Sequence, residues 1–395
     1  MYSIRCPGCD LHVLQHAIKP GESMRCPRCD VRLAKFYSSS LYAELALALT
    51  TIILAVPAYY FPLITIDLFS AMIPASVLTG TITLFSTFPF IAALVLFCSV
   101  IAPVVYSLGV IGAYTSLHFH SKDWLRRSLN ITSQLKYWVM ADVFLISLAI
   151  SCFKVKDYAE IFVGPGLYCF VILQVVYSLL LSRFSTRRIW NAYQQESDNT
   201  EIEGNLISCH HCSENNPIDA TSCQRCGSTL HTREPLSIQK TWAYLISATV
   251  FIFPANLFPI SILLTNGKRL EDTIFSGVAS LIKNGMTGIA IIIFTASIIV
   301  PVAKILGLGF ILFCIHTRNR VYQRFEMKLY GIVQWIGKWS MMDLFVIALM
   351  VALIDRGQIL DFTPGPGAVA FGLVVVLTML AAESLDSRLI WDKNE

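Results

Sequence analysis

Eight apolar runs alternate with short polar segments along this chain. A helix needs about 20 consecutive apolar residues to cross the hydrocarbon core of a bilayer. An open strand edge finds no hydrogen-bond partner in lipid, so such runs are helical when they lie in a membrane. The pattern predicts an all-α polytopic membrane protein whose spans are Leu41–Leu63, Phe88–Leu117, Leu135–Phe153, Gly164–Phe184, Thr241–Leu264, Met286–Ile315, Ile332–Ile354 and Gly365–Ala382.

The composition extends this conclusion to the whole chain of 395 residues. Hydrophobic residues make up 55% of it and charged residues 14%, against roughly 25% charged in a typical soluble domain. This excludes a secreted enzyme, a nucleic-acid-binding factor and a disordered scaffold. The net charge of +4 is small, so the positions of the charges are more informative than their sum.

Basic residues are concentrated after every second span. The opposite loops carry fewer of them, and residues 64–87 carry none. Because Lys and Arg are enriched in cytoplasmic loops, both termini are predicted to be cytoplasmic. The residues that carry this bias include Lys122, Arg126, Arg127, Arg183, Arg187, Arg188, Arg324, Lys328 and Arg388.

The second half of the chain repeats motifs of the first at a nearly constant spacing. The matched pairs are Ser99–Tyr106 with Ser297–Lys304, Trp138–Phe144 with Trp339–Phe345, Gly164–Gly166 with Gly365–Gly367, and Arg187–Trp190 with Arg388–Trp391. Each half holds four predicted spans, an even number, so the halves are expected to form parallel repeats. We call residues 41–190 module 1 and residues 236–395 module 2, and we interpret residues 191–208 as a linker.

Two Cys-x-x-Cys pairs precede each module, in segments that we call ribbon 1 (residues 1–40) and ribbon 2 (residues 209–235). Four thiolates around one tetrahedral ion can fold a segment that has no other core. The eight ligands predicted are Cys6, Cys9, Cys26 and Cys29 in the first quartet and Cys209, Cys212, Cys223 and Cys226 in the second.

A structural zinc ion in each quartet is the leading interpretation, with rubredoxin-like iron as the rival because it uses the same thiolates. His210 and His211 are alternative ligands that four thiolates make unnecessary. A closed four-cysteine site has no open coordination position, so we expect no catalysis by the metal. Cys98, Cys152, Cys169 and Cys314 fit packing positions in apolar spans.

Ionisable residues inside apolar spans are costly and mark pathways or pairs. Lys304 and Asp343 lie at the same predicted depth, roughly 15 Å from the cytoplasmic ends of their spans at 1.5 Å per residue. This makes a Lys304–Asp343 pair possible, either as a structural link or as a proton-responsive element. Ser340, Ser297 and Thr378 could line the same polar network.

Module 1 keeps the acidic position of this network as Asp142, but Tyr106 replaces the lysine and Val139 replaces the serine. Any function of the network is therefore predicted to belong to module 2. Pro103 and Pro301 lie in mid-span and predict kinks in the second and sixth spans.

Taken together, the chain resembles the paraquat-inducible protein A family. The doubled module, the Cys-x-x-Cys pairs, Phe61-Pro62 and Phe258-Pro259 after a first span, and the segments around Asp142 and Asp343 carry the resemblance. It implies an inner-membrane subunit that works with a periplasm-spanning mammalian-cell-entry (MCE) domain protein in lipid trafficking. It also implies cytoplasmic zinc ribbons and polar intramembrane residues at Ser297, Lys304, Ser340, Asp343 and Thr378.

The leading hypothesis is a non-enzymatic membrane subunit that passes phospholipid to or from a periplasmic MCE protein. One alternative is a membrane redox protein with iron in the four-cysteine sites. Another is a proton-coupled exporter of small molecules that acts alone. The chain has no Gly-x-x-x-x-Gly-Lys-[Ser/Thr] loop, so ATP energy would have to come from another protein.

Overall fold

A computed structural model of the chain describes residues 3–14, 22–35, 41–68, 71–87, 89–155, 160–194, 206–209, 212, 214–265, 268–283, 285, 287–317, 322–354 and 360–392. The central part of the predicted linker and the histidines His210 and His211 lie outside these residues.

The two modules contain helices in the same order. Module 1 consists of α1 (Leu41–Tyr60), α2 (Val77–Thr87), α3 (Pro89–Leu96), the π-helical turn η1 (Phe97–Ile101), α4 (Ala102–His118), α5 (Lys122–Leu135), α6 (Ala141–Val155), α7 (Pro165–Arg183) and α8 (Thr186–Gln194). Module 2 consists of α9 (Ser237–Leu257), α10 (Ile274–Lys283), α11 (Thr287–Phe294), the π-helical turn η2 (Thr295–Ile299), α12 (Val300–Thr317), α13 (Gln323–Gly337), the 3-10 turn η3 (Lys338–Met341), α14 (Met342–Ile354), α15 (Pro366–Ser384) and the 3-10 turn η4 (Ser387–Trp391).

The chain is mostly helical, but the prediction of an all-α protein is wrong. Each module carries a three-stranded antiparallel sheet, in the orders β6-β5-β7 and β11-β10-β12. Most of these strands lie between the predicted spans, and the one that overlaps a predicted span, residues 261–265, continues an apolar helical run. Periodicity does not distinguish strand from helix in so short an apolar run. The strands are β5 (Ile64–Leu68), β6 (Ala71–Ala75), β7 (Glu160–Val163), β10 (Ser261–Thr265), β11 (Lys268–Asp272) and β12 (Leu360–Pro364).

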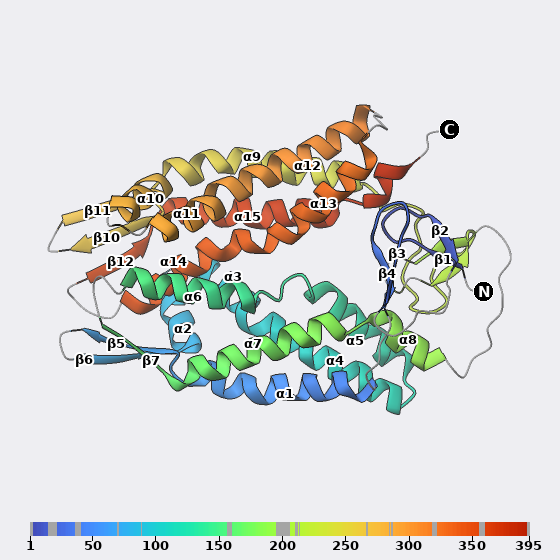
Figure 1. Cartoon of the computed structure of the whole chain (residues 1–395), viewed down its shortest axis with the longest axis horizontal. Helices are drawn as coiled ribbons and strands as arrows, with labels where there is room; N and C mark the ends of the chain where they lie inside the picture. Colours follow the sequence, from blue (N-terminus) through green and yellow to red (C-terminus); the bar gives the residue numbers. More distant parts are fainter. Residues whose placement is uncertain are drawn as a thin grey trace.

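The sheets and the ribbons lie at opposite ends of the helices (Figure 1). Ribbon 1 contains two two-stranded antiparallel hairpins and ribbon 2 contains one, whose first strand lies at the end of the predicted linker. The hairpin strands are β1 (Ser3–Arg5), β2 (His12–Leu14), β3 (Ser23–Arg25), β4 (Arg32–Lys35), β8 (Leu206–Ser208) and β9 (Asn215–Pro217).

Six helical segments of the described chain are long and apolar enough to cross a membrane, so the predicted count of eight is not confirmed. The predicted span Leu135–Phe153 is interrupted after α5, which leaves α6 with 15 residues, about 22 Å of helix against a core of about 30 Å. The predicted span Thr241–Leu264 ends as α9 at Leu257. Lys240 and Asn256 reduce the mean hydropathy of α9. Six such segments still make this a multi-pass membrane protein.

The sequence motifs Phe-Pro and Gly-Pro-Gly lie against each other in both modules. Gly164 N–H donates to Leu63 O at 2.9 Å, and Gly365 N–H donates to Ile260 O at 2.7 Å. A Cβ atom at Gly164 would lie 2.2 Å from Pro62 O, and one at Gly365 would lie 2.0 Å from Pro259 O. Glycine is therefore required where each sheet joins the end of one helix to the start of another.

We expect Gly365→Ala to destabilise module 2, because the added methyl would overlap the carbonyl of Pro259 and overpacking costs about 1–3 kcal/mol. Gly331→Ala is the matched control: no atom lies within 4 Å of its Cβ position in α13, and alanine favours a helix by about 1 kcal/mol. Thermal unfolding in detergent should show a lower Tm for Gly365→Ala alone. An unchanged Tm would contradict the close contact.

The modules meet along α6 and α14, which pack against each other. Ser147 Oγ of α6 donates to Met342 O of α14 at 3.0 Å. The rings of Phe144 and Phe345 lie 5.7 Å apart in an edge-on arrangement, a favourable aromatic geometry. The two shorter inner helices thus form the core of the interface, and the longer helices lie outside them (Figure 1).

Candidate metal centres and a buried polar cluster

The structure brings each predicted cysteine quartet together. All four Sγ atoms of each quartet lie within 4.8 Å of one another. Cys6 Sγ lies 3.3 Å from Cys29 Sγ, and Cys212 Sγ lies 3.6 Å from Cys223 Sγ. These distances exceed the disulfide bond of about 2.05 Å, and all the cysteines are free. A tetrahedral ion with metal–sulfur bonds of about 2.3 Å spaces its sulfurs about 3.8 Å apart, so the quartets fit a metal ion.

Tight turns in the backbone position the thiols. Asp10 N–H donates to Cys6 O and Asp30 N–H to Cys26 O, each at 2.9 Å. Asp10 and Asp30 have φ angles of 61° and 62°, a left-handed conformation that Asp tolerates better than most residues. Gly227 closes the corresponding turn of ribbon 2 with a φ of 65°.

Hydrogen bonds within each quartet lower the pKa of some thiols and raise the pKa of others, such as Cys9 and Cys212, whereas metal binding requires thiolates. The hydrogen bond to Cys29 lowers the pKa of Cys6. The hydrogen bond to Cys212 likewise lowers the pKa of Cys209. Because the remaining thiols must also lose their protons, metal affinity is expected to fall as the pH is lowered.

Ribbon 1 packs on module 2, although it precedes module 1 in the sequence. Cys6, Cys9 and Cys26 share a hydrophobic cluster with residues of α12, α13 and η4. The guanidinium of Arg28 lies 4.4 Å from the ring centroid of Trp391. Ser387 Oγ donates to Gly8 O at 3.4 Å. Arg233 also joins the two regions, since it pairs with both Asp10 and Asp392.

Ribbon 2 packs on module 1 through the equivalent positions. The guanidinium of Arg225 lies 5.5 Å from the ring centroid of Trp190 and donates to Asn191 Oδ1 at 2.7 Å. Arg126 of α5 donates to Gly227 O at 2.8 Å. Arg28 and Arg225 occupy the same knuckle position, and Trp190 and Trp391 the same module position. Each ribbon therefore packs on the module that it does not precede in the sequence, an arrangement that we call crosswise docking.

The five polar residues predicted in module 2 are all buried, and they form two hydrogen-bonded pairs plus one hydroxyl. Ser297 Oγ lies 2.8 Å from Asp343 Oδ2. Lys304 Nζ donates to Thr378 Oγ1 at 2.8 Å. Ser340 Oγ is buried without a partner among the described atoms. The exposed fractions of Ser297, Lys304, Ser340, Asp343 and Thr378 are 2%, 1%, 0%, 7% and 0%.

The direct Lys304–Asp343 ion pair is not among these bonds and stays a prediction. Asp343 lies in the first turn of α14, where the helix dipole stabilises a carboxylate. Ser297 lies in the π-helical turn η2, four residues before Pro301, for which a kink is predicted. Such turns recur at functional sites. The carboxylate of Asp343 thus lies at the start of a helix, and the hydroxyl of Ser297 that bonds to it lies in a π-helical turn.

Module 1 has a different arrangement at the matching positions. Asp142 is exposed, and Ser99 Oγ donates to Val95 O at 2.7 Å. Tyr106 OH is buried without a partner among the described atoms. The described residues at the matching positions of module 1 therefore do not form the hydrogen bonds that define the polar cluster of module 2.

Two features of the functional region were missed from the sequence. Glu44 in α1 is fully buried, pairs with Arg188 at 2.7 Å and accepts a hydrogen bond from Tyr114 at 2.8 Å. A lone glutamate in an apolar run was a signal that could have identified this site. The crosswise docking through Arg28 and Arg225 has no local sequence signature.

Comparisons with known proteins agree with this architecture. The family model described as paraquat-inducible protein A matches residues 41–194 and 238–395. The chain is 38% identical over 393 residues to lipophilic envelope-spanning tunnel protein A of Escherichia coli K12, covering 99% of this chain and 91% of that protein. It is 31% identical over 269 residues to intermembrane transport protein PqiA of the same strain, covering 66% of this chain and 64% of that protein. No solved structure gives a significant match.

Proposed function

This chain belongs to the paraquat-inducible protein A family, and from that membership we propose that it is the inner-membrane subunit of an intermembrane lipid transport system. The observation that carries this proposal is the identity of 38% across 99% of the chain with an envelope-spanning tunnel protein. Phospholipid is the cargo, and a periplasm-spanning protein with MCE domains is the partner. The chain itself is not an enzyme.

The two modules act as parallel repeats, with the ribbons and both termini in the cytoplasm and the sheets in the periplasm. The matching element order of the modules and the basic residues near the ribbons support this orientation. The periplasmic sheets would then face the partner, and the buried polar cluster of module 2 would lie between the two ends.

Purification from native membranes in polymer discs tests the proposed function. We expect an MCE-domain protein and phospholipid to accompany the chain in amounts comparable to the chain itself. A chain that is isolated without an MCE protein and without bound lipid would contradict the proposal and favour an exporter that acts alone.

We propose zinc as the metal in both ribbons, because doubled Cys-x-x-Cys knuckles that close around one ion are typical of structural zinc sites. Elemental analysis of the purified chain should give about two zinc ions per chain, one for each closed site. The preparation should be colourless. A red protein with iron in the same stoichiometry would support the rubredoxin-like alternative.

Labelling from outside the cell tests the orientation. A cysteine introduced at Met72, which is 68% exposed in β6, should react with a membrane-impermeant maleimide applied to the periplasm. A cysteine introduced at Asp219, which is exposed in ribbon 2, should react only after the cells are opened. The reverse pattern, relative to the unsubstituted chain, would invert the topology.

A further inference from the structure

The two modules do not contact each other symmetrically. Helices α2 and α3 of module 1 pack against α14 of module 2, and α3 also reaches α15. The matching helices of module 2 are α10 and α11. Among the described residues, they make no comparable contact with α6 or α7 of module 1. We call the first of these two equivalent contacts closed and the second open.

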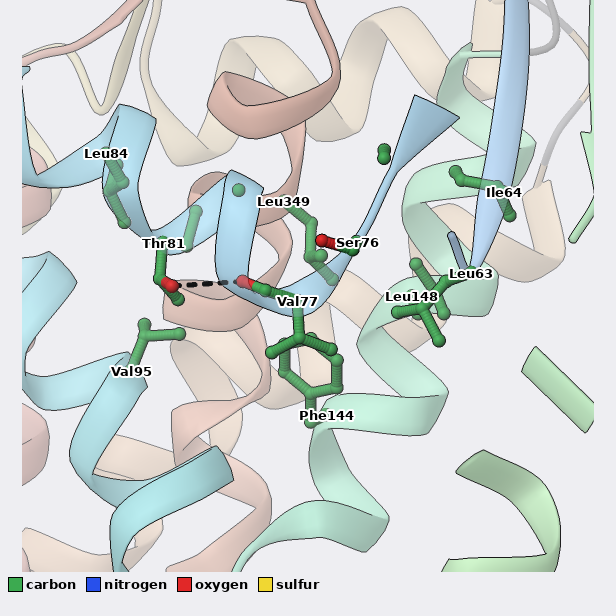
Figure 2. Close-up of a pocket in the computed structure, with 13 residues that line it drawn as sticks. Leu63, Ile64, Ser76, Val77, Thr81, Leu84, Val95, Phe144, Leu148 and Leu349 are labelled. Atoms are coloured by element: carbon green, nitrogen blue, oxygen red, sulfur yellow. Dashed lines mark hydrogen bonds between the residues drawn. The ribbon is translucent and has the colours of Figure 1, made fainter. Parts of the chain in front are cut away.

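The closed contact is tightly packed. Thr81 and Leu84 of α2 line a cavity of only about 30 Å³ together with Leu349 of α14 (Figure 2), which has room for no more than a few water molecules. Phe90 of α3 lies against α15, since a Cβ atom at Gly372 would lie 3.7 Å from Phe90 Cε1. Side chains of module 1 thus cover the α14–α15 face of module 2.

The matching positions at the open contact are uncovered. Gly288 of α11 occupies the position of the phenylalanine, and no described atom lies within 4 Å of its Cβ position. Val171 of α7, which corresponds to the buried Gly372, is 41% exposed. Ala149 of α6 is exposed, whereas the corresponding Met350 of α14 is buried. The α6–α7 face therefore lacks the cover that the α14–α15 face has.

The junction before α11 differs from the junction before α3. Gly285 lies between α10 and α11 with a φ of 78°, and no described atom lies within 4 Å of its Cβ position. Gly288 follows in the first turn of α11. The α2–α3 junction contains no glycine, and Pro89 begins α3. Because proline fixes φ and glycine allows many backbone conformations, only the junction of module 2 is suited to a hinge.

The bilayer does not favour one arrangement of α11 by hydrophobic burial. Lipid tails are as apolar as the side chains of the α6–α7 face, so helix association there depends on van der Waals packing and on small residues that allow close approach. Gly288 of α11 and Ala149 of α6 are such residues. Covering the α6–α7 face therefore requires a fit between helices, which the closed contact already shows for α3.

We propose that α10 and α11 form a gate that closes against α6 and α7, as α2 and α3 lie against α14 and α15. This inference goes beyond the proposed function, because it concerns motion between the modules whatever the cargo is. Helix α11 continues through η2 into α12, and η2 carries Ser297, which is bonded to Asp343. Closing the gate would move Ser297 relative to Asp343, so the gate is linked to the polar cluster.

Photo-crosslinking within one chain per lipid nanodisc tests the gate. The photoreactive residue p-benzoylphenylalanine replaces Ile292, which is 47% exposed and lies one turn after Gly288 on the same side of α11. We expect adducts with α6 or α7, near Ala149 or Val171, and mass spectrometry locates them. The same residue at Leu306 of α12, which is 67% exposed, should give no adduct with module 1. Adducts of position 292 with lipid alone would overturn the gate.

Gly288→Phe should lower the yield of these adducts about tenfold, because its ring would overlap Val171 when α11 closes. The double variant Gly288→Phe with Val171→Gly recreates the Phe90–Gly372 contact and should restore the yield. Gly331→Phe in α13 is the matched control, since no described atom lies within 4 Å of its Cβ position either, and it should leave the yield unchanged. Equal yields in the single and double variants would also overturn the gate.

The link between the gate and the polar cluster has its own test. Ser297→Ala removes the hydroxyl that bonds to Asp343 in the open arrangement, so the adduct yield should rise about tenfold. Ser340→Ala is the control, because the Ser340 hydroxyl is buried without a partner among the described atoms, and its yield should stay the same. An unchanged yield in Ser297→Ala would overturn the link.

Discussion

Cys6→Ser is expected to loosen module 2 and to leave module 1 intact. A four-cysteine site folds around its ion with roughly 10–16 kcal/mol of binding free energy, so the loss of one ligand should unfold ribbon 1. Ribbon 1 covers α13 and η4 through Met327, Ile390 and Trp391. Hydrogen exchange in η4 and in the first turns of α13 should then become faster by a factor of about ten for each 1.4 kcal/mol lost.

Cys226→Ser is the matched variant for the other ribbon. It should expose α5 and α8 of module 1, which hold ribbon 2 through Arg126 and Trp190. Each variant should also lose about half of the bound metal, one of the two closed sites. If Cys6→Ser instead loosened α5 and α8, the crosswise docking would be wrong.

Asp343→Asn should abolish envelope function, whereas Asp142→Asn should have a small effect. Asp343 is buried and bonded to Ser297, while Asp142 is exposed. Losing a buried hydrogen bond to a charged group typically costs about 1.5–3 kcal/mol, so the abundance of each variant must be measured as well. Survival under envelope stress, normalised to the amount of protein in the membrane, measures the function of a strain that carries each variant.

The double variant Lys304→Met with Asp343→Leu distinguishes a structural role from a proton-linked one. If Lys304 and Asp343 form the predicted ion pair, replacing both by apolar residues of similar size is far milder for folding than replacing one. We expect the double variant to reach normal abundance and remain inactive, because neither new side chain can exchange a proton. A fully active double variant would show that the polar cluster has only a structural role.

The local features of this fold were predictable from the sequence. Cys-x-x-Cys knuckles and long apolar runs are set by spacing and hydropathy, and the helices α7 and α15 begin at the Gly-Pro-Gly motifs as predicted. The two sheets were not predictable, because β5 and β10 continue the apolar runs of α1 and α9. Only the pairing of β5 with β7 and of β10 with β12 reveals them as strands.

The sequence predicted which residues belong to the polar cluster of module 2, but not which of them are hydrogen-bonded to each other. Polar residues at matched depth identified Lys304, Asp343, Ser340, Ser297 and Thr378. The equal depths of Lys304 and Asp343 assume that the seventh span is one straight helix, whereas η3 interrupts it from Lys338 to Met341. The partners of each group, and the docking of each ribbon on the distant module, depend on long-range packing that no local pattern encodes.

Transfer of phospholipid between vesicles tests the central claim most directly. Donor vesicles would hold this chain with its co-purified MCE partner and a fluorescent phospholipid, and unlabelled vesicles would act as acceptors. We expect fast transfer with the intact chain, and transfer at the level of partner-only vesicles with Asp343→Asn. Equal transfer with and without the chain, under an imposed pH gradient as well as without one, would contradict it.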